Sequence, residues 1–233
     1  MKKNRLIVWL AMSFFAVMPM MAQLGEVRNN LAIGINGGLN MSQVEFSPSI
    51  KQTNKNGMVL GVTGRYMSEK YFNMLCGIQV ELNYSQRGWN EKIEDGSENT
   101  YSRTMNYLEV PFLAHLAFGK DAIDSGAQFF LNLGPQFAFF LNEKENMSDN
   151  WDPSYRPNGV VQQYGKMVEN KFDYGIVGGG GIELSTKVGH FLLEGRYYLG
   201  LSDFYKSTKK DEFGRSGHSF IGVRLTYLYD IIK

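Results

Sequence analysis

The sequence is poor in cysteine, in proline and in long apolar runs. Cys76 is the single cysteine among 233 residues, so no internal disulfide can form and stability must come from packing and strand pairing. After residue 22 no stretch reaches the length of a membrane-spanning helix, and no long segment repeats with the helical period. These absences disfavour a helical membrane protein and a disulfide-stapled scaffold.

Neither sign of charge dominates. Lys and Arg number 24 against 23 Asp and Glu, which leaves a net charge of +1. That balance provides no electrostatic footprint for nucleic acid, so we expect no nucleic-acid partner. Charged residues are modest in number and aromatic residues are plentiful, which disfavours disorder.

Motifs that carry chemistry are also scarce. The three histidines, at positions 115, 190 and 218, have no metal-ligand spacing with one another or with the cysteine. GGGG at 178–181 lacks the following Lys-Ser/Thr of a phosphate-binding loop and lies inside a strand pattern. In GHS at 217–219, His218 and Ser219 should point to opposite faces of a strand, which disfavours a barrel lipid hydrolase. The sequence therefore predicts no enzyme, no cofactor and no metal site.

What is present begins with an export signal. Lys2, Lys3 and Arg5 precede the apolar stretch 6–18, which is short for a bilayer span, and Ala22 offers a small residue for cleavage. We expect residues 1–22 to be a secretory signal peptide, 23–30 a short periplasmic lead and 31–233 the folded domain. A membrane anchor is the alternative interpretation of the first segment.

Apolar and polar residues then alternate in eight runs, the pattern of half-buried β-strands. IQVELNYS, at 78–85, places Ile, Val, Leu and Tyr on one face and Gln, Glu, Asn and Ser on the other. Pro111 and Pro135 lie inside two runs, where each removes a ladder hydrogen bond, and we expect bulges there. The runs cover residues 31–40, 58–67, 75–85, 107–118, 128–141, 172–185, 191–202 and 219–231.

The connections between runs alternate strictly between short and long. SEKYFN, GKDAIDSG and TKVG are short polar turns, whereas residues 86–106 and 142–171 form the longest connections. In an antiparallel meander all the short turns fall at one end and all the long loops at the other. That layout is typical of an outer-membrane barrel, and a soluble sandwich has no reason to sort its loops in this way.

Aromatic residues on the apolar face fall into two levels that flank an aliphatic band. Two such girdles suit the two surfaces of a bilayer, so we expect the apolar face to meet lipid. The level near the loops contains Tyr84, Phe137, Phe139, Phe172, Tyr174 and Tyr197. The level near the turns contains Tyr66, Phe118, Phe129, Phe191, Tyr227 and Tyr229.

The polar face should then line a narrow interior, since eight strands leave a lumen about wide enough for side chains. Charges of both signs there must pair, because each alone is costly to desolvate. The expected interior charge network consists of Arg65, Glu81, Glu109, Glu183, Glu194, Arg196 and Arg224. In the long loops, Trp89, Trp151 and Tyr155 stand in polar surroundings and are candidate contact residues for a partner.

Several segments resemble the PorT-like family of outer-membrane β-barrel proteins. They are LAIGINGGLNMS, YLEVPFLAHLAFG, FLNLGPQFAFFL, DYGIVGGGGIEL and FLLEGRYYLGLSDF, which span about 31–229 in the same order. The resemblance implies an integral outer-membrane barrel, and the namesake of the family is tied to a protein secretion system. It carries no catalytic residues, and the terminal aromatic of many outer-membrane barrels is replaced here by DIIK after Tyr229.

We predict an all-β, eight-stranded antiparallel transmembrane barrel of the cell outer membrane, with long extracellular loops and short periplasmic turns. Its expected role is structural or interactive rather than enzymatic. Outer-membrane lipid should surround it, and other envelope or secretion proteins are candidate partners at the loops. Two alternatives stay open: an accessory component of an outer-membrane protein secretion system, and a soluble lipocalin-like ligand-binding barrel with its apolar residues inward.

Overall fold

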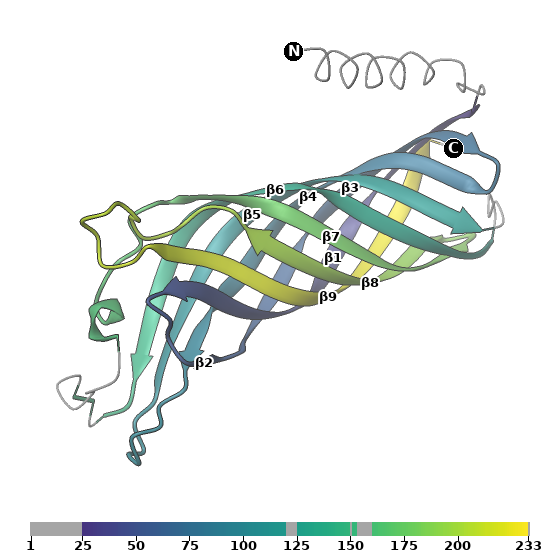
Figure 1. The fold of residues 1–233 in the computed structure, drawn as a ribbon. Helices are drawn as coiled ribbons and strands as arrows, with labels where there is room; N and C mark the ends of the chain where they lie inside the picture. Colours follow the sequence, from purple (N-terminus) through teal and green to yellow (C-terminus); the bar gives the residue numbers. More distant parts are fainter. Residues whose placement is uncertain (1–24, 120–124, 150, 153–159, 233) are drawn as a thin grey trace, which may run out of the picture.

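The structure is a ring of long antiparallel strands (Figure 1). This computed structural model describes residues 25–119, 125–149, 151–152 and 160–232, so the expected signal peptide lies outside the described residues. The strands are β1 (Glu26–Ser47), β2 (Gln52–Thr53), β3 (Lys55–Tyr71), β4 (Met74–Glu91), β5 (Tyr101–Gly119), β6 (Gly126–Met147), β7 (Phe172–Thr186), β8 (Gly189–Gly200) and β9 (Arg215–Ile232). One 3₁₀ turn, η3 (Val161–Gln163), lies between β6 and β7. No helix in these ranges is both long enough and apolar enough to cross a membrane.

Eight of the strands close into a barrel. The sheet order is β2-β4-β3-β1-β9-β8-β7-β6-β5, and an additional β4–β5 pairing completes the ring. Every pairing is antiparallel, from Leu39 opposite Met58 in β1–β3 to Glu194 opposite Arg224 in β8–β9. The two-residue β2 pairs only with the end of β4 and stays outside the ring. The predicted fold class, an eight-stranded antiparallel meander, is confirmed.

The two ends of the barrel differ in their connections, as predicted. β3 and β4 are joined by Phe72 and Asn73 alone, and β7 and β8 by residues 187–188. At the opposite end β6 and β7 are separated by residues 148–171, and β8 and β9 by 201–214. We call these the turn end and the loop end; in Figure 1 the loop end, with β2 beside it, is on the left.

Several strands are longer at the loop end than the alternation predicted. β4 continues to Glu91 and β5 starts at Tyr101, so the predicted loop 86–106 shrinks to residues 92–100. In this extension Arg87 and Trp89 point inward and are fully buried, while Gln86 and Asn90 on the other face are polar. The apolar–polar pattern changes there because above the bilayer the outward face meets water and is polar, while the inward face buries residues such as Trp89.

The start of the barrel and its prolines also differ from expectation. β1 begins at Glu26, within the stretch expected to be a periplasmic lead, because Glu26 and Val27 pair with Lys70 and Glu69 of β3. Apart from Val27, residues 26–30 are polar, so they gave no alternation to detect. At Pro111 and Pro135 the strand register continues without a shift, so neither proline introduces the expected bulge.

The outward face of the barrel is apolar and the inward face is polar. Mid-strand residues such as Ile35, Leu39 and Leu60 are 57–64% exposed. Near the loop end Phe172 packs against Phe137 and Phe139, with ring centroids 6.1 and 5.4 Å apart. This arrangement is the reverse of a soluble lipocalin-like barrel, whose apolar residues would have to face inward.

Labelling from outside the cell tests the orientation of the two ends. In a Cys76→Ala background, Glu98→Cys lies in the exposed β4–β5 connection and Lys187→Cys in the exposed β7–β8 turn. Because outer-membrane barrels keep long loops outside, we expect a membrane-impermeant maleimide to label position 98 on intact cells and position 187 only after lysis. The opposite pattern would invert the barrel, and labelling of both on intact cells would refute the meander.

Candidate functional site

The lumen is crossed by two arginine–carboxylate pairs that join opposite walls. In the ring, β3 lies opposite β7 and β4 opposite β8, since three strands separate each pair on either side. Arg65 of β3 reaches Glu183 of β7 through two hydrogen bonds of 2.6 and 2.8 Å. Arg196 of β8 reaches Glu81 of β4 through two hydrogen bonds of 2.8 Å each. Bidentate pairs of this kind are strong and directional, so they brace the barrel across its full width.

Glu81, one of the two carboxylates in these cross-lumen pairs, accepts further hydrogen bonds. Besides Arg196, it accepts hydrogen bonds from Gln79 at 2.7 Å and from Asn83 at 2.8 Å. Arg196 also donates to Glu194, its neighbour two residues away, at 2.8 and 3.1 Å. Gly179 makes room for this arrangement, because a Cβ there would lie 2.6 Å from Glu194 Oε1.

The seven residues expected to form the interior charge network all lie in the lumen, each at most 3% exposed. Six of them are ion-paired. The partner of Glu109 is Arg87, a residue that the sequence analysis did not include. Arg224 differs: it donates to Asn40 Oδ1 at 2.8 Å, and no carboxylate of the described chain lies within ion-pair distance of it.

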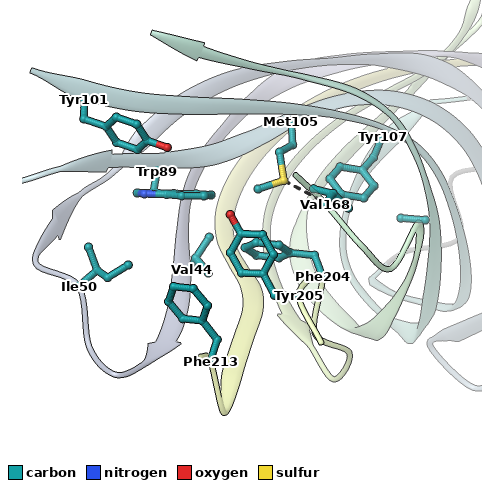
Figure 2. Close-up of a cluster of buried hydrophobic side chains, with 11 residues drawn as sticks. Val44, Ile50, Trp89, Tyr101, Met105, Tyr107, Val168, Phe204, Tyr205 and Phe213 are labelled. Carbon is teal, nitrogen blue, oxygen red and sulfur yellow. Dashed lines mark hydrogen bonds between the residues drawn. The ribbon is translucent and has the colours of Figure 1, made fainter. Parts of the chain in front are cut away.

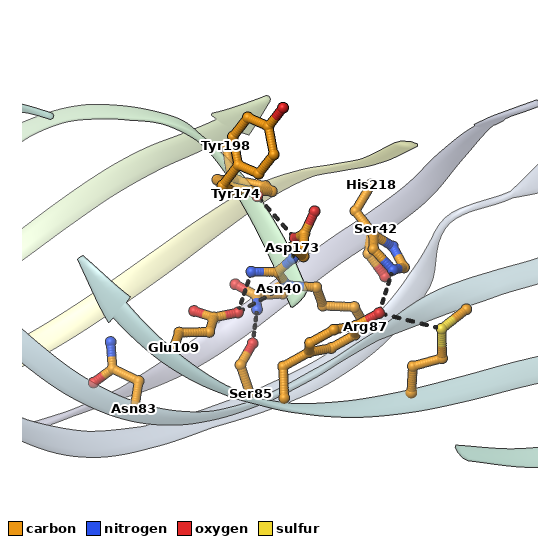
Figure 3. Close-up of polar contacts among 12 residues, drawn as sticks. Asn40, Ser42, Asn83, Ser85, Arg87, Glu109, Asp173, Tyr174, Tyr198 and His218 are labelled. Carbon is orange, nitrogen blue, oxygen red and sulfur yellow. Dashed lines mark hydrogen bonds and ion pairs between the residues drawn. The ribbon is translucent and has the colours of Figure 1, made fainter. Parts of the chain in front are cut away.

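Arg87 organises a third charged layer nearer the loop end (Figure 3). It contacts Glu109 at 2.7 Å and Asp173 at 2.6 Å, and its guanidinium lies 4.5 Å from the ring centre of Tyr198. Tyr198 in turn donates to Asp173 at 2.8 Å. Extending the inward positions of β4 by two residues past Ser85 leads to Arg87. Asp173 is an even number of residues from Glu183 in β7, so it points to the same, inward side.

Above this layer an aromatic cluster closes the loop end of the lumen (Figure 2). Trp89 lies 5.0 Å from Phe46 and 6.0 Å from Phe204, measured between ring centres, and it donates from Nε1 to Gln163 of η3 at 3.1 Å. We call the cluster and the described parts of the connections around it, 148–149, 151–152, 160–171 and 201–214, the dome. Its buried members are Val44, Ile50, Trp89, Tyr101, Met105, Tyr107, Ala138, Val168, Phe204, Tyr205 and Phe213.

Tyr205 anchors one side of the dome. Its hydroxyl contacts Arg103 and donates to the backbone oxygen of Lys166 at 3.1 Å. Arg103 also pairs with Glu143 at 2.9 Å and Glu145 at 3.1 Å. Burial raises the pKa of the Tyr205 hydroxyl well above its usual range, against the opposing effect of Arg103, so the hydroxyl remains neutral.

The three aromatic residues proposed as loop contacts have different fates. Trp89 is not in a loop: it lies on the extension of β4 and is 0% exposed, so it cannot meet a partner directly. Trp151 is partly buried and packs on Tyr101 and Tyr164, at 5.4 and 4.9 Å between ring centres. Tyr155 lies outside the described residues. Trp89 and Trp151 therefore belong to the dome rather than to an exposed contact surface.

One constellation at the turn end has the residue types of a hydrolase. Ser185 Oγ lies 3.0 Å from His190 Nδ1, and His190 Nε2 lies 3.0 Å from Asp230 Oδ1. However, Glu183 Oε1 lies 2.7 Å from the same Nδ1. The nitrogen that faces the serine hydroxyl thus also faces a carboxylate and is not held for the serine alone, which disfavours a Ser–His nucleophile pair. The arrangement is therefore a structural link between β7, β8 and β9.

The sequence matches the outer membrane protein beta-barrel domain family over residues 21–206. The chain belongs to this family. It is an outer-membrane β-barrel protein, located in the cell outer membrane, and its apolar outer face lies against membrane lipid. The match stops before β9, the strand that closes the ring against β1.

Solved structures match the chain at low sequence identity, and the likeness to the first of them shows the fold. OprG from Pseudomonas aeruginosa matches with a TM-score of 0.53 and 12% identity, covering 90% of this chain and 99% of that chain. Ail, the attachment invasion locus protein of Yersinia pestis, matches with a TM-score of 0.37 and 11% identity, covering 88% and 100%. No curated protein matches the sequence.

Proposed function

We propose that this outer-membrane barrel is non-enzymatic and acts through its loop end, as a structural or interaction protein of the PorT-like type. The observation that carries the proposal is the lumen, which two ion pairs cross from wall to wall beneath a buried aromatic cluster. A lumen filled in this way offers neither a solute path nor room for a substrate. The surface left for function is the dome and the strand ends around it.

The role as an accessory component of an outer-membrane protein secretion system is a narrower form of the same proposal. It rests on the resemblance of segments such as YLEVP and NLGP to PorT-like proteins. An interaction role and the accessory role both require a protein partner at the loop end, and they differ in what that partner is.

Site-specific photo-crosslinking in intact cells tests the proposal. A photoreactive residue in place of Met167, which is 72% exposed in the 148–171 connection, should yield an adduct with another protein. The control replaces Val62, which is 51% exposed on the lipid face of β3, and should yield none. A second photoreactive residue can replace Val161, which is 39% exposed in the same connection. If neither position gave a protein adduct, the loop end would not be an interaction surface. A partner from a secretion apparatus would favour the accessory role.

A further inference from the structure

A surface hollow lies where the wall of the barrel meets the dome. It has a volume of about 540 Å³ and opens between the start of β7 and the connections 148–171 and 201–214. Its lining includes Asn170, Lys171, Phe172, Tyr174, Leu201 and Ser207. The hollow lies on the outside of the barrel, and none of the lumen charges described above lines it.

The depth of the hollow in the membrane follows from its apolar residues. Phe172, Tyr174 and Leu201 face outward and are 46%, 44% and 47% exposed. The two aromatic residues belong to the girdle near the loop end, the level at which such rings mark the boundary between lipid and water. The hollow therefore opens among the headgroups of the outer leaflet.

The charges around the hollow leave one cation available. Glu169 faces Lys166 at 3.7 Å and accepts the backbone N–H of Lys206 at 2.9 Å. Asp203 Oδ1 accepts the backbone N–H of Ser216 at 2.7 Å and also faces Arg215. Lys171 is exposed, and no carboxylate of the described chain lies within ion-pair distance of its ammonium.

The position of Lys171 is set by the strand beneath it. Its backbone oxygen accepts the N–H of Phe140 at 2.7 Å, which continues the β6–β7 ladder by one residue. Beside it, Asn170 commits its amide N–H to the backbone oxygen of Asp203 at 2.8 Å, which leaves its side-chain oxygen as an acceptor. An exposed lysine on a backbone held by the β6–β7 ladder, an amide acceptor, the Ser207 hydroxyl and aromatic rings thus line the hollow at one membrane depth.

We propose that this hollow binds the phosphorylated sugar headgroup of an outer-leaflet glycolipid. Lys171 pairs with a phosphate oxygen, and Asn170 and Ser207 bond to sugar hydroxyls. Phe172, Tyr174 and Leu201 lie along the first part of the acyl chains. A phosphate group alone does not fill about 540 Å³, and the neutral hydrogen-bonding groups beside the cation fit a sugar better than a simple glycerophosphate.

Binding of three probes to the folded barrel in detergent micelles, measured by native mass spectrometry, tests the proposal. The probes are a bisphosphorylated glucosamine-disaccharide lipid, phosphatidylglycerol and inorganic phosphate. We expect the glycolipid to bind most tightly. Lys171→Gln should weaken its binding about tenfold, the size of one charge-assisted hydrogen bond. The double variant Asn170→Ala with Ser207→Ala should weaken glycolipid binding and leave phosphatidylglycerol unchanged.

The matched control is Lys144→Gln, an exposed lysine of β6 that does not line the hollow. It should bind the glycolipid like the wild type, and every variant should keep the gel mobility of the folded barrel. Equal affinity of the wild type and Lys171→Gln would overturn the proposal. So would phosphatidylglycerol binding as tightly as the glycolipid. Neither result bears on whether the lumen is closed or on the protein adduct at Met167.

Discussion

Arg196→Ala is expected to lower the free energy of unfolding of the barrel by about 3–5 kcal/mol, the usual cost of leaving buried charges without their partner. The substitution removes both cross-lumen bonds to Glu81 and both bonds to Glu194. Those carboxylates are each 2% exposed and would remain as two buried anions side by side. Urea unfolding of the barrel in lipid vesicles, followed by circular dichroism, measures the change.

Two further variants separate the stability lost with the ion pair itself from the cost of leaving its carboxylates buried without a partner. The triple variant Arg196→Met, Glu81→Gln and Glu194→Gln removes the charges together and should recover most of the loss, because whole buried ion pairs can often be replaced at little cost. Lys92→Ala, at an exposed pair with Glu94, should leave stability unchanged. If Arg196→Ala has the same free energy of unfolding as the Lys92→Ala control, the Arg196–Glu81 pair does not brace the barrel.

Trp89→Ala is expected to have a comparable effect at the loop end, a loss of about 3–5 kcal/mol. The indole is fully buried, and its removal leaves a cavity between Phe46 and Phe204 and frees Gln163 of η3. The 148–171 connection loses one of its anchors, the bond from Trp89 to Gln163, so it should also become more readily cleaved by protease added to intact cells. Thermal melting of the folded gel band and the protease pattern provide the two measurements.

Trp151→Ala is the matched control for this variant. Its ring also packs on Tyr101 and Tyr164, but it is only partly buried, so the loss of stability should be clearly smaller. Equal losses of stability in the two variants would mean that the fully buried Trp89 contributes no more to the stability of the cluster than the partly buried Trp151.

Much of the barrel wall could be predicted because a membrane barrel has a strict inward and outward parity. Once Glu81 was set inward by its apolar neighbours at 80 and 82, every second residue of that strand followed. The same argument put Arg65, Glu183 and Arg196 in the lumen. The sorting of turns and loops by length gave the meander.

The pairing of these charges could not be predicted. Which arginine faces which carboxylate depends on the stagger between strands around the ring, and no local pattern encodes that stagger. Arg87 was missed because the alternation was followed only where one face was apolar, whereas Asp173 lies between the outward Phe172 and Tyr174 and parity alone would have placed it in the lumen. Beyond the lipid boundary the outward face is polar and the apolar residues lie on the inward face instead, so β4 looked like a loop and Trp89 looked like an exposed contact residue.

Planar-bilayer recording of the purified wild-type barrel tests the closed lumen most directly. The preparation must show the gel mobility of the folded barrel, and a conducting porin in the same membranes verifies the assay. Because ion pairs cross the lumen and the dome covers its outer end, we expect no stepwise ion currents from the wild type at voltages at which the porin conducts. Steady unitary currents from the folded wild-type barrel would contradict the account and make it a channel.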